Sequence, residues 1–310
     1  MRLLIFGGTG LIGRALADEL TAEGSEVWIV TRRTFGEAGG GPGIGSSGSG
    51  APGPRFVSWD AWEADPSRWE GFDAIVNLAG ETINQRWTKA AKARIMGSRV
   101  QAAEKIAAVM GRMSSPPPVV VNASAISVYG HSEGTGVLLD ESSPPQPSDF
   151  LGDTIVQWEE AADRIPARRL VKLRIGVVLS RRGGAFPLLR LPYLLFAGGR
   201  LGSGRQGMPW IHLADVTGLI RLSLTHPEIS GPLNAVAPDP VTNDEFGRRL
   251  ARVMGRPHWF HIPAPLIRLA LGEMSTLLLT GPAAYPRKAL EHGYTYKFPR
   301  LEDALRDLLA

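Results

Sequence analysis

Hydrophobic runs alternate with segments of helical periodicity along the first 180 residues. Short apolar runs that end at glycine or at polar residues are typical of buried strands, and the longer segments between them are typical of helices. The predicted strands cover 3–6, 26–30, 56–59, 74–78, 119–123 and 170–179. The predicted helices cover 15–23 and 90–110, and a further one ends over 158–164. This alternation predicts an α/β fold with a doubly wound parallel sheet of the Rossmann-like type.

The pattern loosens after residue 180, where proline- and glycine-rich stretches separate short helices at 243–254 and 301–309. We therefore expect two domains. Residues 1–180 would form a dinucleotide-binding domain to which 209–238 return, and 181–208 with 239–310 would form a smaller C-terminal, substrate-side domain. Residues 35–54 hold nine of the chain's 37 glycines and almost no apolar residue, which predicts a flexible surface insertion. A lid over a ligand is the alternative.

A glycine motif stands at the end of the first predicted strand. Gly7, Gly10 and Gly13 form Gly-x-x-Gly-x-x-Gly between that strand and a helix. A pyrophosphate on the amides of a helix N-terminus needs such close approach of the backbone, so the motif indicates a dinucleotide site. The alternative is a tight turn with no ligand. Asn77-Leu78-Ala79-Gly80, at the end of a later strand, supplies further small residues where the cofactor would pass.

The end of the second predicted strand favours NADP over NAD. Proteins that bind NAD usually place an Asp or Glu there for the ribose 2′-hydroxyl, whereas this strand ends in Val30-Thr31-Arg32-Arg33. Hydroxyl and guanidinium groups suit a 2′-phosphate, which a carboxylate would repel. The alternative is that the two arginines are solvated surface charge.

Several strings together resemble one protein family. SAISVYG from Ser124, WIHLADV from Trp210 and GPLNAVA from Gly231 are similar to segments of the extended short-chain dehydrogenase/reductase superfamily. A second set of strings resembles its sugar-nucleotide-epimerase-like subfamily with a C-terminal domain of unknown function. These strings are NLAGETI from Asn77, RWTKAAKARIMGSR from Arg86, FLGDTIVQWEEAA from Phe150, PWIHLADV from Pro209, NDEFGRRLARVMGRP from Asn243, and 282–298.

The resemblance implies that the cofactor is NADP, and it assigns residues to each part of that molecule. Those implied at the pyrophosphate are Gly7, Thr9, Gly10, Leu11 and Ile12. Those implied at the adenosine ribose phosphate are Thr31 and Arg32. The remaining positions to which the resemblance points are Leu78, Ala79, Arg94, Arg99 and Val178.

Enzymes of this superfamily usually use a Tyr-x-x-x-Lys pair together with a Ser or Thr. None of the five tyrosines has a lysine four residues on, and no lysine stands between Lys105 and Lys172. Leu151 and Ile155 lie near the places expected for the pair, and Ser124 lies near the usual hydroxyl. We therefore expect that the usual Tyr–Lys mechanism, in which the lysine lowers the tyrosine pKa, is absent.

Other side chains could face a pocket instead. These candidates are Arg86, Trp87, Trp210 and His212. The alternative is that they serve the framework, the tryptophans by packing and the histidine by hydrogen bonds to the backbone. Asp215 is expected to be the N-cap of a helix over 216–224. His258 and His261 lack a carboxylate at ligand spacing, so no zinc site is expected.

Composition narrows the function classes. The 310 residues include no cysteine, which excludes disulfides, thiolate metal sites and a cysteine nucleophile. The net charge of +4 is spread along the chain, so a nucleic-acid partner is not expected. No apolar run reaches about 18 residues and no secretory signal is recognised, so we expect a cytoplasmic protein without a membrane partner.

Two functions remain open from the sequence. The first is an NADP(H)-binding, epimerase-like oxidoreductase that acts on a small molecule without the Tyr-x-x-x-Lys pair. The alternative is a noncatalytic NADPH-binding redox sensor or scaffold. The sequence leaves the substrate and the oligomeric state undetermined.

Overall fold

The computed structural model describes residues 1–32, 53–131 and 136–310. Its centre is a parallel sheet of seven strands in the order β11-β6-β5-β4-β1-β2-β3. The strands are β1 (Arg2–Phe6), β2 (Glu26–Thr31), β3 (Arg55–Ser58), β4 (Ala74–Asn77), β5 (Val119–Ala125), β6 (Arg169–Ile175) and β11 (Gly231–Ala235). The predicted fold class is confirmed. The predicted insertion over 35–54 lies almost wholly outside the described residues.

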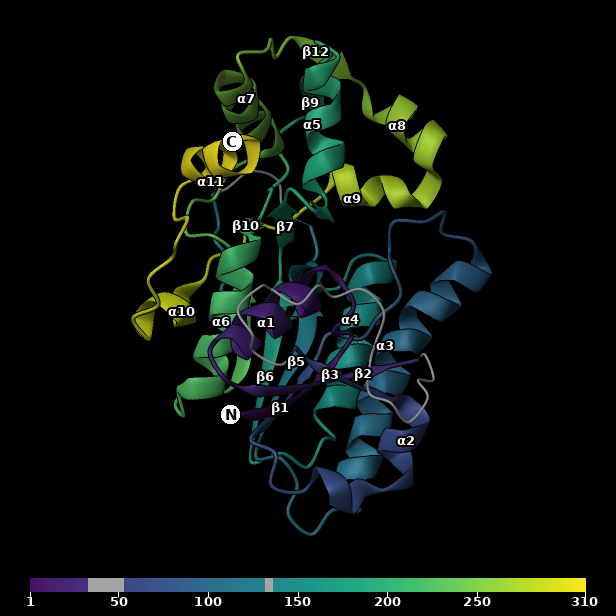
Figure 1. The fold of residues 1–310 in the computed structure, drawn as a ribbon. Helices are drawn as coiled ribbons and strands as arrows, with labels where there is room; N and C mark the ends of the chain where they lie inside the picture. Colours follow the sequence, from purple (N-terminus) through teal and green to yellow (C-terminus); the bar gives the residue numbers. More distant parts are fainter. Residues whose placement is uncertain (33–52, 132–135) are drawn as a thin grey trace.

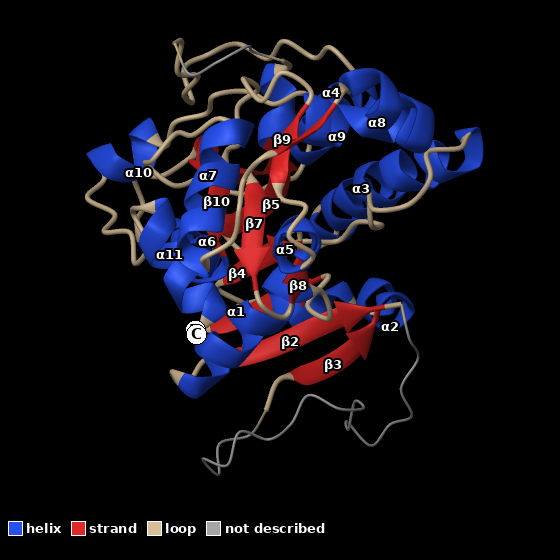
Figure 2. Cartoon of the chain, turned by 90° about the horizontal axis from the view of Figure 1, so that it is seen from above, coloured by secondary structure: helices blue, strands red, loops and turns tan. Residues whose placement is uncertain are grey.

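Helices cover both faces of this sheet (Figure 1). On one face α1 (Leu11–Ala22) packs beside α6 (Leu213–Thr225), and on the other α3 (Lys89–Met110) packs beside α4 (Phe150–Ala162). Alternate residues of β1 serve the two faces: Leu3 and Ile5 are buried under α1 and α6, and Leu4 and Phe6 under α3 and α4. Figure 2 shows β2 and β3 side by side at one edge, next to α2 (Trp59–Ala64). The short 3₁₀ helices η1 (Pro66–Trp69) and η2 (Ile126–Tyr129) contribute to the core on the face that α3 and α4 cover.

A smaller part of the chain is stacked on the end of this sheet (Figure 1). It contains a three-stranded sheet, β10-β7-β8, and a two-stranded sheet, β12-β9. Their strands are β7 (Val177–Ser180), β8 (Gly183–Gly184), β9 (Gly199–Leu201), β10 (Trp210–His212) and β12 (Phe260–Ile262). The helices of this part and of the C-terminal segment are α5 (Phe186–Leu194), α7 (Asn243–Met254), α8 (Ala264–Leu271), η3 (Gly272–Ser275), α9 (Thr276–Leu279), α10 (Arg287–Glu291) and α11 (Leu301–Leu309).

The predicted single strand over 170–179 is wrong. The chain leaves the central sheet at Gly176, and the residues after it, β7, pair with β10 instead of continuing β6. A Cβ at position 176 would lie 2.3 Å from the carbonyl oxygen of Pro209, so the crossing of these two segments requires glycine. The strand predicted over 56–59 is displaced by one residue, because β3 ends at Ser58, which caps α2 by accepting a hydrogen bond from the amide of Ala61.

Candidate functional site

The glycine turn between β1 and α1 lies against the chain that follows β4. Gly7 has φ +75°, and a Cβ there would lie 2.5 Å from the carbonyl oxygen of Leu78 and 2.8 Å from the amide nitrogen of Ala79. The turn is closed by a hydrogen bond of 3.0 Å from the amide of Gly10 to the carbonyl of Gly7. The structure thus brings together the two strand ends that the sequence predicted to meet at a dinucleotide.

The N-terminus of α1 is open to a ligand. Gly10 is the N-cap and, having no side chain, makes no side-chain hydrogen bond to the helix. Thr9 and Gly10 are exposed, and Leu11 and Ile12 form the first turn of the helix. Because the first amides of a helix carry partial positive charge, this end suits a phosphate.

Thr31 is the last residue of β2, where it pairs with Ser58 of β3, and Arg32 follows it and is exposed. No carboxylate ends β2. Hydrogen bonds from Gln85 and Arg94 lower the pKa of Glu81, and the positive charge of Arg32 adds to this effect. The charge of Arg32 therefore reaches Glu81 in the segment that follows β4.

The two arginines of α3 are engaged with the same segment. Arg94 donates from Nε to Oε1 of Glu81 at 3.1 Å and from Nη2 to Oε1 of Gln85 at 3.1 Å. Arg99 donates from Nη1 to the carbonyl oxygens of Glu81 at 3.0 Å and Ile95 at 2.9 Å. Burial lowers the pKa of Arg99 to about 10. Both arginines hold the chain after Ala79 in position.

Val178 belongs to the hairpin of β7 and β8, and this hairpin lies against the residue that follows the glycine turn. A Cβ at Gly184 would lie 2.9 Å from the carbonyl oxygen of Val178 and 3.2 Å from Cδ2 of Leu11. The hairpin therefore packs against the first residue of α1. The expected cofactor residues other than Arg94, Arg99 and Val178 lie at strand ends or at the start of α1. Arg94 and Arg99 lie within α3, and Val178 lies within β7. Contact of any of these residues with a cofactor stays a prediction.

Apolar side chains occupy the places where the superfamily's catalytic pair is expected. Leu151 and Ile155 stand in the first two turns of α4 and are buried. Leu151 packs in a cluster with Trp87 and Ile95, in which the rings of Trp87 and Phe150 are 5.4 Å apart. Neither position offers a group that could donate or accept a proton.

A buried polar network crosses the sheet next to these positions. Arg174 of β6 donates from Nε to Oε1 of Glu159 and from Nη2 to Oε2, each at 2.8 Å. Ser124 donates to Glu159 at 2.6 Å, so its hydroxyl points to the middle of α4. Arg174 also donates to the hydroxyl of Tyr129 at 2.9 Å, which donates to Asn234 of β11 at 2.8 Å.

Sequence reasoning missed Glu159 and Arg174. Ser124, Arg174 and Asn234 are paired in register across β5, β6 and β11. The sequence signal for this pair was a charged residue at position 174 in a strand expected to be buried, a placement that usually requires an ionic partner.

The structure describes all five tyrosines, and burial raises the pKa of four of them. Burial raises the pKa of Tyr129 despite the nearby charge of Arg174. Burial also raises the pKa of Tyr193 to about 12 and moves those of Tyr294 and Tyr296 upward. A phenol with a raised pKa holds its proton more tightly at neutral pH, which is the reverse of what the usual mechanism requires.

The other sequence candidates serve the framework. The indole of Trp210 donates to the carbonyl of Asp239 at 3.0 Å, and that of Trp87 donates to the carbonyl of Ile83 at 3.0 Å. His212 packs against Phe298 with ring centroids 4.1 Å apart and the ring planes tilted by 46°, and its burial lowers its pKa. Arg86 is exposed next to Trp87.

The predicted N-cap role of Asp215 is wrong. The helix begins at Leu213, and its N-cap is His212, whose Nδ1 accepts from the amide of Ala214 at 3.2 Å. Asp215 lies in the first turn, where it accepts from the amides of Lys297 at 2.7 Å and Phe298 at 3.0 Å. Its carboxylate therefore fixes the C-terminal segment onto α6, a partnership that no local sequence pattern reveals.

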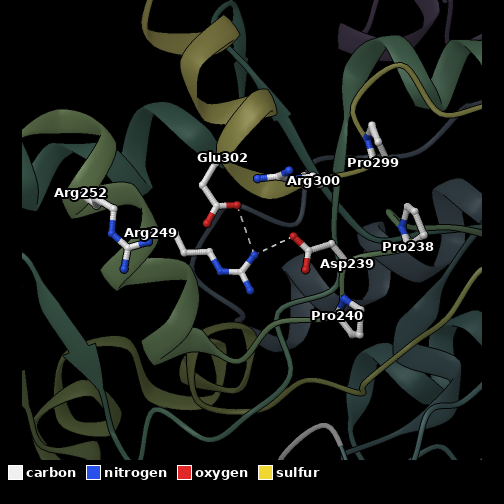
Figure 3. Close-up of a pocket in the computed structure, with 8 residues that line it drawn as sticks. All are labelled: Pro238, Asp239, Pro240, Arg249, Arg252, Pro299, Arg300 and Glu302. Carbon is white, nitrogen blue, oxygen red and sulfur yellow. Dashed lines mark hydrogen bonds and ion pairs between the residues drawn. The ribbon is translucent and has the colours of Figure 1, made fainter.

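A separate depression of about 620 Å³ lies between α7 and α11 (Figure 3). Its lining residues are Pro238, Asp239, Pro240, Arg249, Arg252, Pro299, Arg300 and Glu302. Nη1 of Arg249 lies 2.7 Å from Oδ2 of Asp239 and 3.4 Å from Oε2 of Glu302. None of the predicted cofactor residues borders this depression.

A metal site and a membrane-spanning helix are both absent from the described residues. Among residues 1–32, 53–131 and 136–310, no group of three or more His, Asp or Glu side chains is placed to hold a metal ion. Over the same ranges, no helix has the length and apolar character needed to cross a membrane.

A parallel sheet whose first strand leads through a glycine turn with positive φ into an open helix N-terminus defines the dinucleotide-binding class of α/β proteins. The matches of this chain to known protein families indicate the same class. Residues 3–152 match the model described as "NAD dependent epimerase/dehydratase family", and residues 262–308 match "Domain of unknown function (DUF1731)". The chain belongs to this epimerase family, which confirms the resemblance predicted from its sequence.

Relatives match the chain along its whole length. It is 36% identical over 314 residues to the epimerase family protein YfhF of Bacillus subtilis, covering 100% of this chain and 98% of that protein. The crystal structure of human epimerase family protein SDR39U1 (isoform 2) with NADPH has a TM-score of 0.87 and 36% identity, covering 99% of each chain. A nucleoside-diphosphate sugar epimerase from Corynebacterium glutamicum has a TM-score of 0.73 and 28% identity, covering 100% of this chain and 58% of that one.

Proposed function

We propose that this protein binds NADP(H) at the glycine turn and uses it as an epimerase-like oxidoreductase on a small molecule. The observation that carries the proposal is the packing of Gly7 on Leu78 and Ala79 beneath the open start of α1, with Arg32 in place of a carboxylate after β2. The human relative with 36% identity, crystallised with NADPH, supports the same cofactor.

The residues of the site suit each part of this cofactor. The α1 amides would hold the pyrophosphate, and Thr31 and Arg32 the phosphate on the adenosine ribose. NADPH, when bound, supplies a hydride from its nicotinamide. Leu151 and Trp87 would exclude water from the reacting end, and Arg99 would keep the chain after Ala79 in position.

A cofactor titration tests the binding half of the proposal. We expect NADPH to bind more tightly than NADH when each is titrated by fluorescence. Arg32→Asp should weaken NADPH binding about tenfold or more and leave NADH nearly unchanged, because it removes one charge-assisted bond to a phosphate. Arg164→Asp is the matched control, since Arg164 is 68% exposed and lies beyond the end of α4. NADH binding as tight as NADPH would contradict the proposal.

The alternative of a noncatalytic NADPH sensor or scaffold is favoured by one specific observation. Leu151 and Ile155 are buried and apolar, and Tyr129 is held between Arg174 and Asn234. Screening a metabolite library for NADPH oxidation separates the two functions. Turnover of any member supports the enzyme, whereas tight NADPH binding without turnover across the library supports the sensor.

If turnover is found, single Tyr→Phe changes at all five tyrosines test the proposed absence of a tyrosine acid. We expect no single change to abolish the rate in a variant that still binds NADPH. Loss of turnover with retained NADPH binding in any one variant would assign the proton transfer to that tyrosine.

A further inference from the structure

Exposed hydrophobic side chains gather at one end of the molecule. In the described part of the chain, ten of the fourteen exposed large hydrophobic side chains lie in two segments, 188–196 and 259–277. Leu269 is 85% exposed, and Leu195 and Trp259 are each 69% exposed. The other seven tryptophans are buried or partly buried. We call Leu195, Phe196, Trp259, Phe260, Leu266 and Leu269 the apolar tip.

The apolar tip is held in shape by its own backbone. The indole nitrogen of Trp259 donates to the carbonyl of Phe196 at 3.0 Å, and the amide of Trp259 donates to Gly198 at 3.1 Å. These bonds join the end of α5 to β12, and α8 follows directly. Figure 1 shows α5, β12 and α8 at the end of the structure away from β1, β2 and β3. The exposed rings are therefore fixed in place.

The longer stretches that contain these two segments carry the chain's excess positive charge. Residues 181–208 and 252–281 contain eight arginines, no lysine and a single carboxylate, Glu273, which is paired with Lys92 of α3. The rest of the chain has 26 basic and 29 acidic residues. The apolar tip thus belongs to a strongly cationic region of a protein that is otherwise slightly acidic.

Three arginines lie next to the tip without a carboxylate. The guanidinium of Arg256 stacks 4.4 Å from the ring centre of Phe196, and its Nε is buried without a hydrogen-bond partner. Arg200 of β9 pairs in register with His261 of β12, and Arg268 precedes Leu269 on α8. Within the residues that the structure describes, none of these three arginines forms an ion pair, unlike Arg248 and Arg249 of α7.

We propose that the apolar tip is a peripheral docking surface for a membrane rich in anionic phospholipids. Trp, Phe and Leu side chains projecting beside arginines suit the boundary between headgroups and acyl chains. The unpaired guanidinium groups complement phosphate headgroups. A second copy of the chain is the poorer occupant, because it would bring two arginine-rich surfaces together. A protein that docks on a membrane surface needs no spanning helix. The expectation from the sequence that the protein has no membrane partner was based on the lack of a long apolar run, so it does not bear on peripheral docking.

Vesicle sedimentation tests the proposal on the full chain. We expect binding to vesicles of equal parts phosphatidylglycerol and phosphatidylcholine, and at least tenfold weaker binding to pure phosphatidylcholine. Arg256→Gln and Arg268→Gln should each weaken binding about fivefold, as expected for one cation near an anionic surface. Leu266→Gln with Leu269→Gln should abolish most of it, and Leu138→Gln, at an exposed leucine outside the tip, should not. Arg164→Gln is the matched control for charge.

Fluorescence places the contact at the tip. Binding should shift tryptophan emission to the blue, brominated lipid should quench it, and Trp259→Phe should remove both effects while sedimentation persists. No sedimentation with anionic vesicles, or equal sedimentation with neutral ones, would overturn the proposal. A concentration-dependent dimer that Leu269→Gln dissociates, together with no vesicle binding, would assign the surface to a second copy instead.

Discussion

Gly7 and Gly24 show at the scale of single residues how the surroundings of a glycine decide its role. Both have positive φ, +75° and +84°, but a Cβ at Gly7 would meet the backbone of Leu78 at 2.5 Å, while nothing lies within 4 Å of one at Gly24. A Cβ costs roughly 1–2 kcal/mol at either position from the backbone conformation alone. At Gly7 a Cβ would in addition push the end of β1 away from Leu78, which follows β4.

We predict that Gly24→Ala lowers the free energy of unfolding by about 1 kcal/mol and leaves NADPH affinity unchanged. Gly7→Ala should lower it by about 2 kcal/mol more, as overpacking does, and should abolish NADPH binding. Urea unfolding and fluorescence titration measure the two effects. Equal losses of stability in both variants would show that the contact with Leu78 carries no energy.

At the scale of elements, the ion pair between Glu159 and Arg174 joins α4 to β6. Their side chains are 8% and 4% exposed, respectively. Burial alone would raise the pKa of Glu159, but the hydrogen bonds and charge of Arg174 outweigh it and lower the pKa below the usual 4.5. A carboxylate with a lowered pKa stabilises the fold fully above pH 4.5. That contribution is lost as the pH falls from 4.5 through the folded pKa.

Glu159→Gln should therefore lower the free energy of unfolding by about 3–5 kcal/mol at pH 7, because it leaves a buried guanidinium without its counter-ion. The difference from the parent protein should shrink as the pH falls below 4.5. Glu104→Gln, at a glutamate 48% exposed and 3.7 Å from Arg164, is the control and should change stability by less than about 0.5 kcal/mol. A difference that stays constant down to low pH would contradict the assignment.

Local sequence signals predicted most of the elements and missed what depends on distant partners. The glycine motif indicated a helix after β1, although the predicted range 15–23 begins four residues after the start of α1 at Leu11, and apolar runs located β1, β2, β4 and β5. Residues 170–179 have the β-branched and apolar character of a single strand, and the division between two sheets becomes visible only where Gly176 crosses Pro209 in the structure. The network of Ser124, Arg174 and Asn234 was likewise hidden, because strand register brings together residues far apart in the sequence.

At the scale of the whole molecule, buried contacts fix the C-terminal segment onto the first part of the chain. Asp215 is 1% exposed and accepts from the amides of Lys297 and Phe298. It also accepts from the hydroxyl of Tyr294 at 3.2 Å. One carboxylate thus joins α6, which covers the central sheet, to the chain that leads into α11.

We predict that Asp215→Ala lowers the free energy of unfolding by about 3 kcal/mol, since it leaves the buried amide of Phe298 and the partly buried amide of Lys297 without an acceptor. Asp215→Asn keeps one acceptor oxygen and should cost about half as much. Asp303→Ala, at an aspartate whose side chain is 44% exposed, should stay within about 0.5 kcal/mol of the parent. Urea unfolding provides the measurement, and a cost for Asp215→Ala no larger than that for Asp303→Ala would overturn the anchoring role.

The position of β11 also determines when the protein can finish folding as it is made. Among the strands of the described residues, β11 pairs only with β6, yet residues 176–230 are synthesised between these two strands. At about 5–20 residues per second, the ribosome leaves the outer edge of β6 unpaired for roughly 3–11 s. Exposed strand edges invite pairing with other chains, and the charges of Lys172 and Arg174 on β6 discourage it during that interval. Completion of the sheet must therefore wait for translation of most of the chain.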